Sequence, residues 1–81
     1  MTNKYLNQLA DTFLKFESRK EVTDFLKGIM TPQELIEIPQ RLEIVRRLKQ
    51  GDTQRKIAED LGVGIATVTR GSRELKKGRF K

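Results

Sequence analysis

The chain has 81 residues, a formal net charge of +6, and no cysteine, histidine or tryptophan. This length allows one small domain, and the missing cysteine and histidine exclude disulfides, thiolate metal sites and the commonest general base. No apolar run approaches the roughly 20 residues that cross a bilayer, and no secretory signal is visible. We therefore expect a single cytoplasmic domain over residues 1–81 that is not an enzyme and that binds no metal, prosthetic group or membrane.

The first half of the chain predicts two short helices. Apolar residues recur at three- and four-residue steps over residues 3–17, which predicts the first helix. Ser18 and Glu21 have the spacing of a capping box and start a second helix over 20–29. Because only 36% of the residues are apolar, the core of a lone monomer is thin, and we expect these helices to complete it against a second copy.

A third helix follows and ends at Gly51. Thr31 and Glu34 form another capping box, and Pro32 suits the first helical turn, where no N–H donor is needed. Pro39 lies inside the helical pattern, and it removes one backbone hydrogen bond, so we expect a kink or a break there. Residues 3–50 are therefore interpreted as dimerisation helices.

The last two helices are short. Asp52 or Thr53 caps the fourth, which covers residues 54–60, and the fifth covers 65–77. Residues 78–81 are expected to fray. No segment alternates apolar and polar residues over a useful length, so the sequence predicts an all-α fold with five helices and no strand.

Residues 52–77 have the pattern of a helix-turn-helix. Ala58 allows a close helix crossing, and Gly62 supplies the turn, where we expect a positive φ. Apolar residues at the spacing that packs the two helices together are Ile57, Leu61, Val63, Ile65 and Val68. The residues left on the outer face of the helix over 65–77 are Ala66, Thr67, Thr69, Arg70 and Arg73. The alternative is a plain helical hairpin within a bundle, but core packing does not explain a small, hydroxyl-rich outer face.

The basic residues are concentrated in the second half of the chain, which contains the helix-turn-helix pattern. Residues 1–40 contain five basic and six acidic residues, whereas residues 41–81 contain twelve and five. A concentrated basic region favours a polyanionic partner, because neutralising phosphates releases counterions. A solvated surface and an anionic membrane are alternatives, although the basic half lacks the broad apolar face that membrane binding requires.

The sequence GIATVTRGS over residues 64–72 closely resembles the tryptophan repressor family. Thr53, Gln54 and Arg55 before it, the pair Thr31-Pro32 and the pair Gln40-Arg41 extend the resemblance over roughly residues 30–77. It implies a five-helix, intertwined homodimer of Trp repressor-like helix-turn-helix fold, in which this chain lacks the family's final C-terminal helix. It also implies a bacterial transcriptional repressor that acts in the cytoplasm, at the nucleoid.

The partner that the resemblance implies is double-stranded DNA, read as a palindromic operator by two recognition helices in successive major grooves. Threonine hydroxyls and the methyl groups of threonine and alanine suit base edges, and the start of the fourth helix suits a phosphate. The residues expected to bind DNA are Gln54, Arg55, Gly64, Ile65, Ala66, Thr67, Thr69 and Arg73.

The same resemblance implies L-tryptophan as corepressor, with no prosthetic group. Arg41 and Arg70 match two arginines that sandwich the indole, which is a favourable cation–π arrangement. Thr31 matches a residue near the ligand carboxylate, and Gly71 matches backbone that lies against the ring. Glu74 stands where the family usually has a serine, and a carboxylate there either pairs with the ligand ammonium or repels the ligand carboxylate.

Three other functions are weighed against a tryptophan-controlled repressor. A regulator of the same fold could respond to another ligand or to none. A basic module for RNA or a protein partner would usually expose aromatic residues for stacking, but four of the five aromatic residues lie in the first half at core spacing. An enzyme is the weakest case, because no nucleophile has a base beside it.

Overall fold

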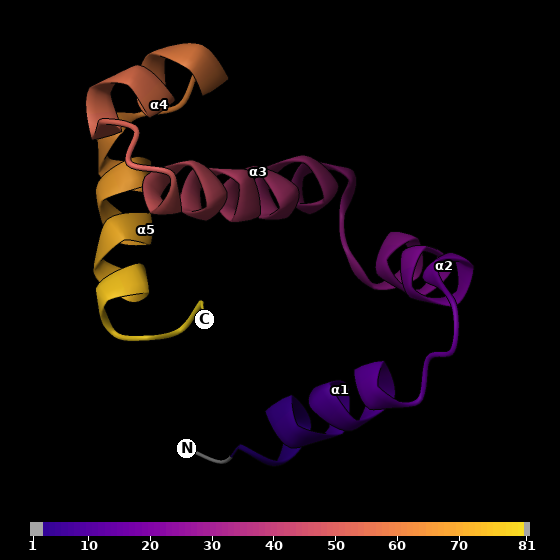
Figure 1. The fold of residues 1–81 in the computed structure, drawn as a ribbon. Coiled ribbons are helices and arrows are strands. Elements are labelled where there is room, and N and C mark those ends of the chain that lie inside the picture. The colour runs from indigo at the N-terminus through magenta and orange to yellow at the C-terminus, as the bar shows by residue number, and fades with distance from the viewer. Residues whose placement is uncertain (1–2, 81) are drawn as a thin grey trace. The chain divides into compact units, whose positions relative to one another are not determined.

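The computed structural model describes residues 3–80, which divide into two compact units, residues 3–35 and residues 36–80. Within residues 3–80 there are five helices and no strand, which confirms the all-α prediction. Figure 1 labels them in chain order. Their bounds are α1 Lys4–Leu14, α2 Arg19–Ile29, α3 Pro32–Lys49, α4 Gln54–Leu61 and α5 Ile65–Lys76.

The first unit is built around three phenylalanine rings. The centroid of Phe13 lies 5.8 Å from that of Phe16 and 5.5 Å from that of Phe25, and Phe16 and Phe25 are 5.2 Å apart. Separations and tilted orientations of this kind are favourable for aromatic pairs. The first helix is shorter than predicted, because Lys15 and Phe16 bond back to Thr12 and Phe13 in a tight turn after Leu14. This turn brings Phe16 against Phe25.

Both predicted capping residues occupy the N-termini of their helices. Ser18 Oγ accepts a hydrogen bond from the N–H of Glu21 at 3.2 Å, while the Glu21 carboxylate accepts from Glu17, one residue earlier than a capping box requires. At the start of α3 the box is complete. Thr31 N–H donates to Glu34 Oε1 at 2.8 Å, and Glu34 N–H donates to Thr31 Oγ1 at 3.2 Å.

Helix α3 continues through Pro39 without interruption, so the break that we considered there does not occur. Proline removes one N–H donor from the helix interior, but the intact turns on both sides maintain the helix. At its C-terminal end α3 carries Ile44 and Val45, which are 1% and 3% exposed. These two residues anchor α3 in the core of the second unit.

The core of the second unit takes one fully buried residue from each of three helices. These are Ile44 of α3, Ile57 of α4 and Val68 of α5, which are all at most 1% exposed. Partly buried residues surround them, namely Leu48, Ala58, Leu61 and Val63. Gly62 ends α4 with a φ of +67°, as predicted, and its N–H donates to Ala58. The helix-turn-helix therefore packs on the end of α3.

Gly71 sets the distance between α5 and α3. A Cβ atom at Gly71 would lie 3.1 Å from Cγ2 of Ile44, which is tighter than ordinary van der Waals contact. Glycine in a helix interior costs about 1 kcal/mol relative to alanine. The close crossing of the two helices explains why the chain carries this cost.

Arg47 ties the end of α3 to the following loop and to α4. Its Nε lies 2.7 Å from Asp52 Oδ2, its Nη2 lies 2.8 Å from Asp60 Oδ2, and only 13% of its side chain is exposed. Because Asp52 is engaged by Arg47, the cap of α4 is Thr53, whose Oγ1 accepts from the N–H of Lys56. The hydrogen bond from Arg47 is also the main cause that lowers the pKa of Asp60.

The packing at Gly71 predicts different effects on stability for two glycine substitutions. Gly28 lies in α2, and a Cβ there would meet nothing within 4 Å, so Gly28→Ala should stabilise the fold by about 0.4–1 kcal/mol. Gly71→Ala should give none of this gain, because Ile44 is enclosed in the core and must shift. Urea unfolding of both variants measures the difference. An equal gain for Gly71→Ala would mean that α3 and α5 are not in tight contact.

The Arg47 ion pairs predict a dependence of stability on pH. Because the folded pKa of Asp60 is lowered, the stabilisation is complete above the ordinary value of 3.8 and is lost as the pH falls below it. Asp60→Asn should therefore lower the melting temperature at neutral pH and flatten its fall in acid. Glu59→Gln is the matched control, since Glu59 forms no ion pair with the described residues. Parallel acid profiles for the wild type and Asp60→Asn would contradict this role.

Candidate functional site

The first turn of α5 presents small side chains to solvent. Ala66 and Thr67 are exposed, and Gly64 caps the helix with a φ of −69° and open space where a Cβ would lie. We expected Ile65 to pack inward with Val68, but it is 52% exposed, because it lies at the first residue of α5, where no other element covers it. Four of the residues expected to bind DNA therefore form one exposed turn.

Two further candidates are brought together by a hydrogen bond. Thr69 Oγ1 donates to Oε1 of Gln54 at 2.8 Å, and it also lies 3.0 Å from the carbonyl oxygen of Ile65. Thr69 and Gln54 are both half-buried, so Thr69 is less open to solvent than its predicted place on the outer face implies. Their contact joins the first residue of α4 to the middle of α5.

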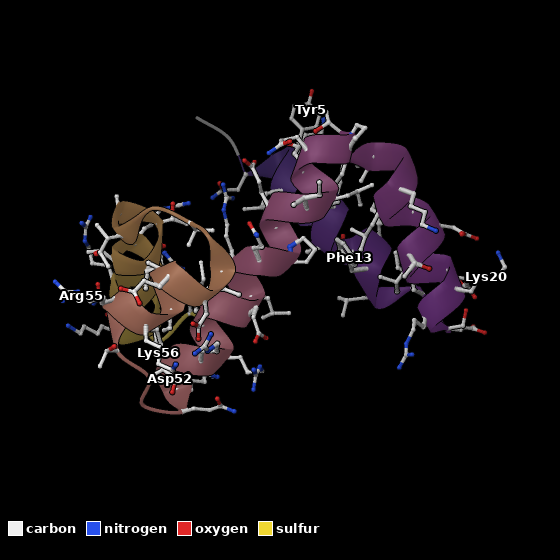
Figure 2. All side chains as sticks on the ribbon, turned by 90° about the horizontal axis from the view of Figure 1, so that it is seen from above. Tyr5, Phe13, Lys20, Asp52, Arg55 and Lys56 are labelled. Atoms are coloured by element: carbon white, nitrogen blue, oxygen red, sulfur yellow. The ribbon has the colours of Figure 1, made fainter. Side chains whose placement is uncertain are left out.

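The remaining candidates for DNA binding are exposed cations. Arg55 lies on the outer side of α4, next to Lys56 (Figure 2). Arg73 is exposed near the end of α5. Neither Arg55 nor Arg73 forms an ion pair with any of residues 3–80, so both guanidinium groups are available to a polyanion.

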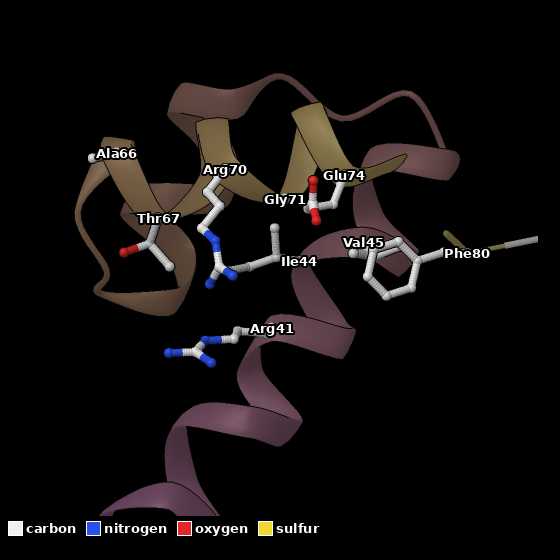
Figure 3. Close-up of a pocket in the computed structure, with 9 residues that line it drawn as sticks. All are labelled: Arg41, Ile44, Val45, Ala66, Thr67, Arg70, Gly71, Glu74 and Phe80. Carbon is white, nitrogen blue, oxygen red and sulfur yellow. The ribbon is translucent and has the colours of Figure 1, made fainter. Parts of the chain in front are cut away.

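A pocket of about 450 Å³ lies between α3 and α5. Figure 3 shows Arg41 and Arg70 extending into the same side of this pocket from the two facing helices. Within the described part of the chain neither guanidinium has an ion-pair partner. The other lining residues are Ile44, Val45, Ala66, Thr67, Gly71, Glu74 and Phe80. The pocket thus combines two unpaired cations with an apolar floor.

Glu74 places a negative charge in the same pocket. Its Oε2 lies 2.9 Å from Nζ of Lys77, and this hydrogen bond is the main cause that lowers the pKa of Glu74. The positive charge of Arg70 acts in the same direction more weakly. Glu74 is therefore ionised at neutral pH, and the pocket contains charges of both signs.

Phe80 lines the pocket, although the sequence pattern led us to expect fraying there. The chain leaves α5 through Gly78, whose φ is +82°, and the N–H of Gly78 donates to Leu75 while that of Arg79 donates to Glu74. This pair of bonds forms a Schellman motif. It returns the chain toward α3, where Phe80 lies beside Val45 (Figure 3). A glycine directly after a lysine-rich helix end is the signal that predicts this turn. Lys81 lies outside the described residues.

Of the five residues expected to bind a ligand, the structure brings four together. Arg41, Arg70, Gly71 and Glu74 all line the pocket between α3 and α5. Thr31 belongs to the other unit, where its backbone and hydroxyl form the capping box of α3. Ile44, Val45 and Phe80 are the lining residues that the sequence pattern did not single out.

The described residues contain no cluster of acidic side chains that could hold a metal ion. None of the helices in residues 3–80 is long and apolar enough to span a membrane.

Comparison with known proteins agrees with this geometry. The family model described as Trp repressor protein matches residues 4–80. The Trp operon repressor homolog of Vibrio vulnificus is 44% identical over 70 residues, which cover 85% of this chain and 69% of that protein. That of Photobacterium profundum is 52% identical over 70 residues, with 85% and 68% covered.

A further relative has no assigned role. The uncharacterized protein YerC of Bacillus subtilis is 33% identical over 78 residues, which cover 96% of this chain and 75% of that protein. No solved structure gives a significant match. The family match extends over nearly the whole described chain, including the helix-turn-helix and every residue of the pocket. The chain therefore belongs to the Trp repressor family of DNA-binding regulators.

Proposed function

We propose that this protein is a sequence-specific transcriptional repressor whose affinity for DNA is controlled by L-tryptophan. The observation that carries this proposal is the pocket between α3 and α5, because its lining includes two residues of the exposed turn, Ala66 and Thr67. A ligand in this pocket would contact α5, the helix that we propose to read DNA. The repressor acts in the cytoplasm, on the DNA of the nucleoid.

The chemistry of the pocket suits a zwitterion with a flat apolar side chain. Arg41 and Arg70 can bind a carboxylate and stack on an aromatic ring. Ile44 and Val45 supply the apolar floor, and the missing side chain of Gly71 leaves room for close approach. L-Tryptophan combines these features in one molecule.

Glu74 takes part through its charge. Lys77 keeps Glu74 ionised, and a carboxylate in the pocket attracts an ammonium group. Of the two roles considered for Glu74, we propose the pairing with the ligand ammonium. The carboxylate of the ligand then points away from Glu74, toward the guanidinium groups.

A regulator that responds to another ligand, or to none, is the second candidate. In that candidate Glu74 takes the other of its two roles, in which its carboxylate repels the ligand carboxylate and excludes free amino acids from the pocket. The relative from Bacillus subtilis, whose match covers 96% of this chain, is named only as an uncharacterized protein, so its similarity supports the second candidate as well as the first.

We also propose that the protein acts as an intertwined homodimer on a palindromic operator. Large apolar side chains on the first three helices are exposed, including Tyr5, Leu6, Leu14, Ile29, Ile36 and Leu42. Burial of such residues contributes about 1.5–3 kcal/mol each, and a second copy of the chain offers the same residues in return. Two copies related by a two-fold axis would present two copies of α5 to the DNA.

Calorimetric titration tests the ligand. L-Tryptophan should bind the wild type with one site per chain, and Arg70→Ala should weaken binding at least about tenfold, because hydrogen bonds to charged groups contribute about 1.5–3 kcal/mol. Arg73→Ala is the matched control, because Arg73 lies on the same helix but does not line the pocket. Binding unaffected by Arg70→Ala would refute the sandwich, and no binding to the wild type would favour the second candidate.

DNA binding tests the exposed first turn of α5, residues 64–67, as the part of the protein that contacts bases. A duplex enriched by the wild-type protein from a random library serves as the specific site, and an unrelated duplex serves as the comparison. Thr67→Ala should weaken binding to the enriched duplex about tenfold and leave the unrelated duplex unchanged, since one base contact discriminates by about 1–3 kcal/mol. Thr23→Ala, on α2, is the control. Equal loss on both duplexes would contradict a base-reading role for Thr67.

A further inference from the structure

The hydrogen bond between Thr69 and Gln54 changes the role expected for each residue. Thr69 lies in the middle of α5, and Gln54 is the first residue of α4, yet their side chains meet at 2.8 Å. A threonine hydroxyl has one hydrogen to donate. Of the two acceptors within reach, the amide oxygen of Gln54 is nearer than the carbonyl oxygen of Ile65, which is 3.0 Å away.

The bond to Thr69 engages the oxygen end of the Gln54 amide. The oxygen of the amide accepts from Thr69, so the NH2 group at the opposite end stays free. No described residue accepts a hydrogen bond from this group. Arg55 and Lys56 follow directly in α4, and both are exposed cations. The NH2 group of Gln54 offers two N–H donors. It lies beside two exposed cations, whose charges attract anions.

We propose that Thr69 is a positioning residue, which orients Gln54 so that the Gln54 amide donates to an acceptor on DNA. The acceptor is a phosphate oxygen or an acceptor atom on a base edge. The Thr69 hydroxyl itself makes no contact with the DNA. This assignment rests on DNA binding by the helix-turn-helix, and it deepens that proposal by naming the hydrogen-bonding polarity of one contact.

Isosteric substitutions separate this role from a direct contact. Gln54→Glu keeps an oxygen for Thr69 but replaces the donor by a carboxylate oxygen, so it should weaken binding to the enriched duplex at least tenfold and more than Gln54→Ala does. Gln50→Glu is the matched control, because it adds the same charge at an exposed position in the same unit. Affinities are measured by fluorescence anisotropy at fixed salt and fixed L-tryptophan, at a temperature where circular dichroism shows every variant folded.

Thr69 is tested through its coupling to Gln54. Thr69→Val, which lacks the hydroxyl, should weaken binding about threefold to tenfold, and Thr69→Ser should restore it. In the Gln54→Ala background, Thr69→Val should cause no further loss. A purely structural role for Thr69 would give the same loss in both backgrounds, as would direct contact between its hydroxyl and the DNA, and either would overturn the proposal.

The remaining outcomes are also distinguishable. Wild-type binding by Gln54→Glu would show that the amide donor does not face the DNA, which overturns the inference while the repressor function stands. A wild type that does not prefer the enriched duplex would instead refute the proposed function. Loss by Gln54→Ala on both duplexes identifies a phosphate as the acceptor, whereas loss on the enriched duplex alone identifies a base.

Discussion

The close contact between α3 and α5 at Gly71 and Ile44 determines both the core and the pocket of the second unit. A Cβ at Gly71 would come within 3.1 Å of Ile44, and Ile44 in turn packs in the cluster that contains Ile57 and Val68. The same crossing forms the pocket, because Arg41 and Arg70 extend from the two helices on one side of it. Close packing transmits strain, so the proposed ligand at this crossing would act on α5 directly.

The exposed first turn of α5 also borders the pocket. Ala66 and Thr67 are exposed at the first turn of α5, and both also line the pocket. Arg47 at the end of α3 bonds Asp52 in the loop and Asp60 near the end of α4, and Thr53 caps the start of α4. These bonds fix α4 to α3, whereas no such ion pair joins α5 to α3 within residues 3–80. A ligand shifts an equilibrium only by its differential affinity for two states. The proposed control by L-tryptophan therefore requires a pocket that closes better in one position of α5.

The five helices follow from the apolar spacing, and the starts of α2, α3 and α4 follow from Ser18, Thr31 and Thr53, because these signals are local in the sequence. The structure departs from the pattern where a distant residue decides. Phe16 lies outside α1 and packs against Phe25, Asp52 pairs with Arg47 while Thr53 caps α4, and Gln54 bonds Thr69 across the turn. Four residues that line the pocket, namely Arg41, Arg70, Gly71 and Glu74, were predicted through the family resemblance. Phe80 was missed because its place depends on the turn at Gly78.

The measurement that tests the central claim most directly is the affinity of the wild-type protein for its enriched duplex as L-tryptophan is added. Allosteric coupling usually amounts to about 1–3 kcal/mol, or roughly 5-fold to 150-fold in affinity. The account predicts that binding tightens within this range as the ligand saturates, and that Arg70→Ala abolishes the response. An affinity that stays constant while calorimetry shows the pocket to be saturated would contradict it.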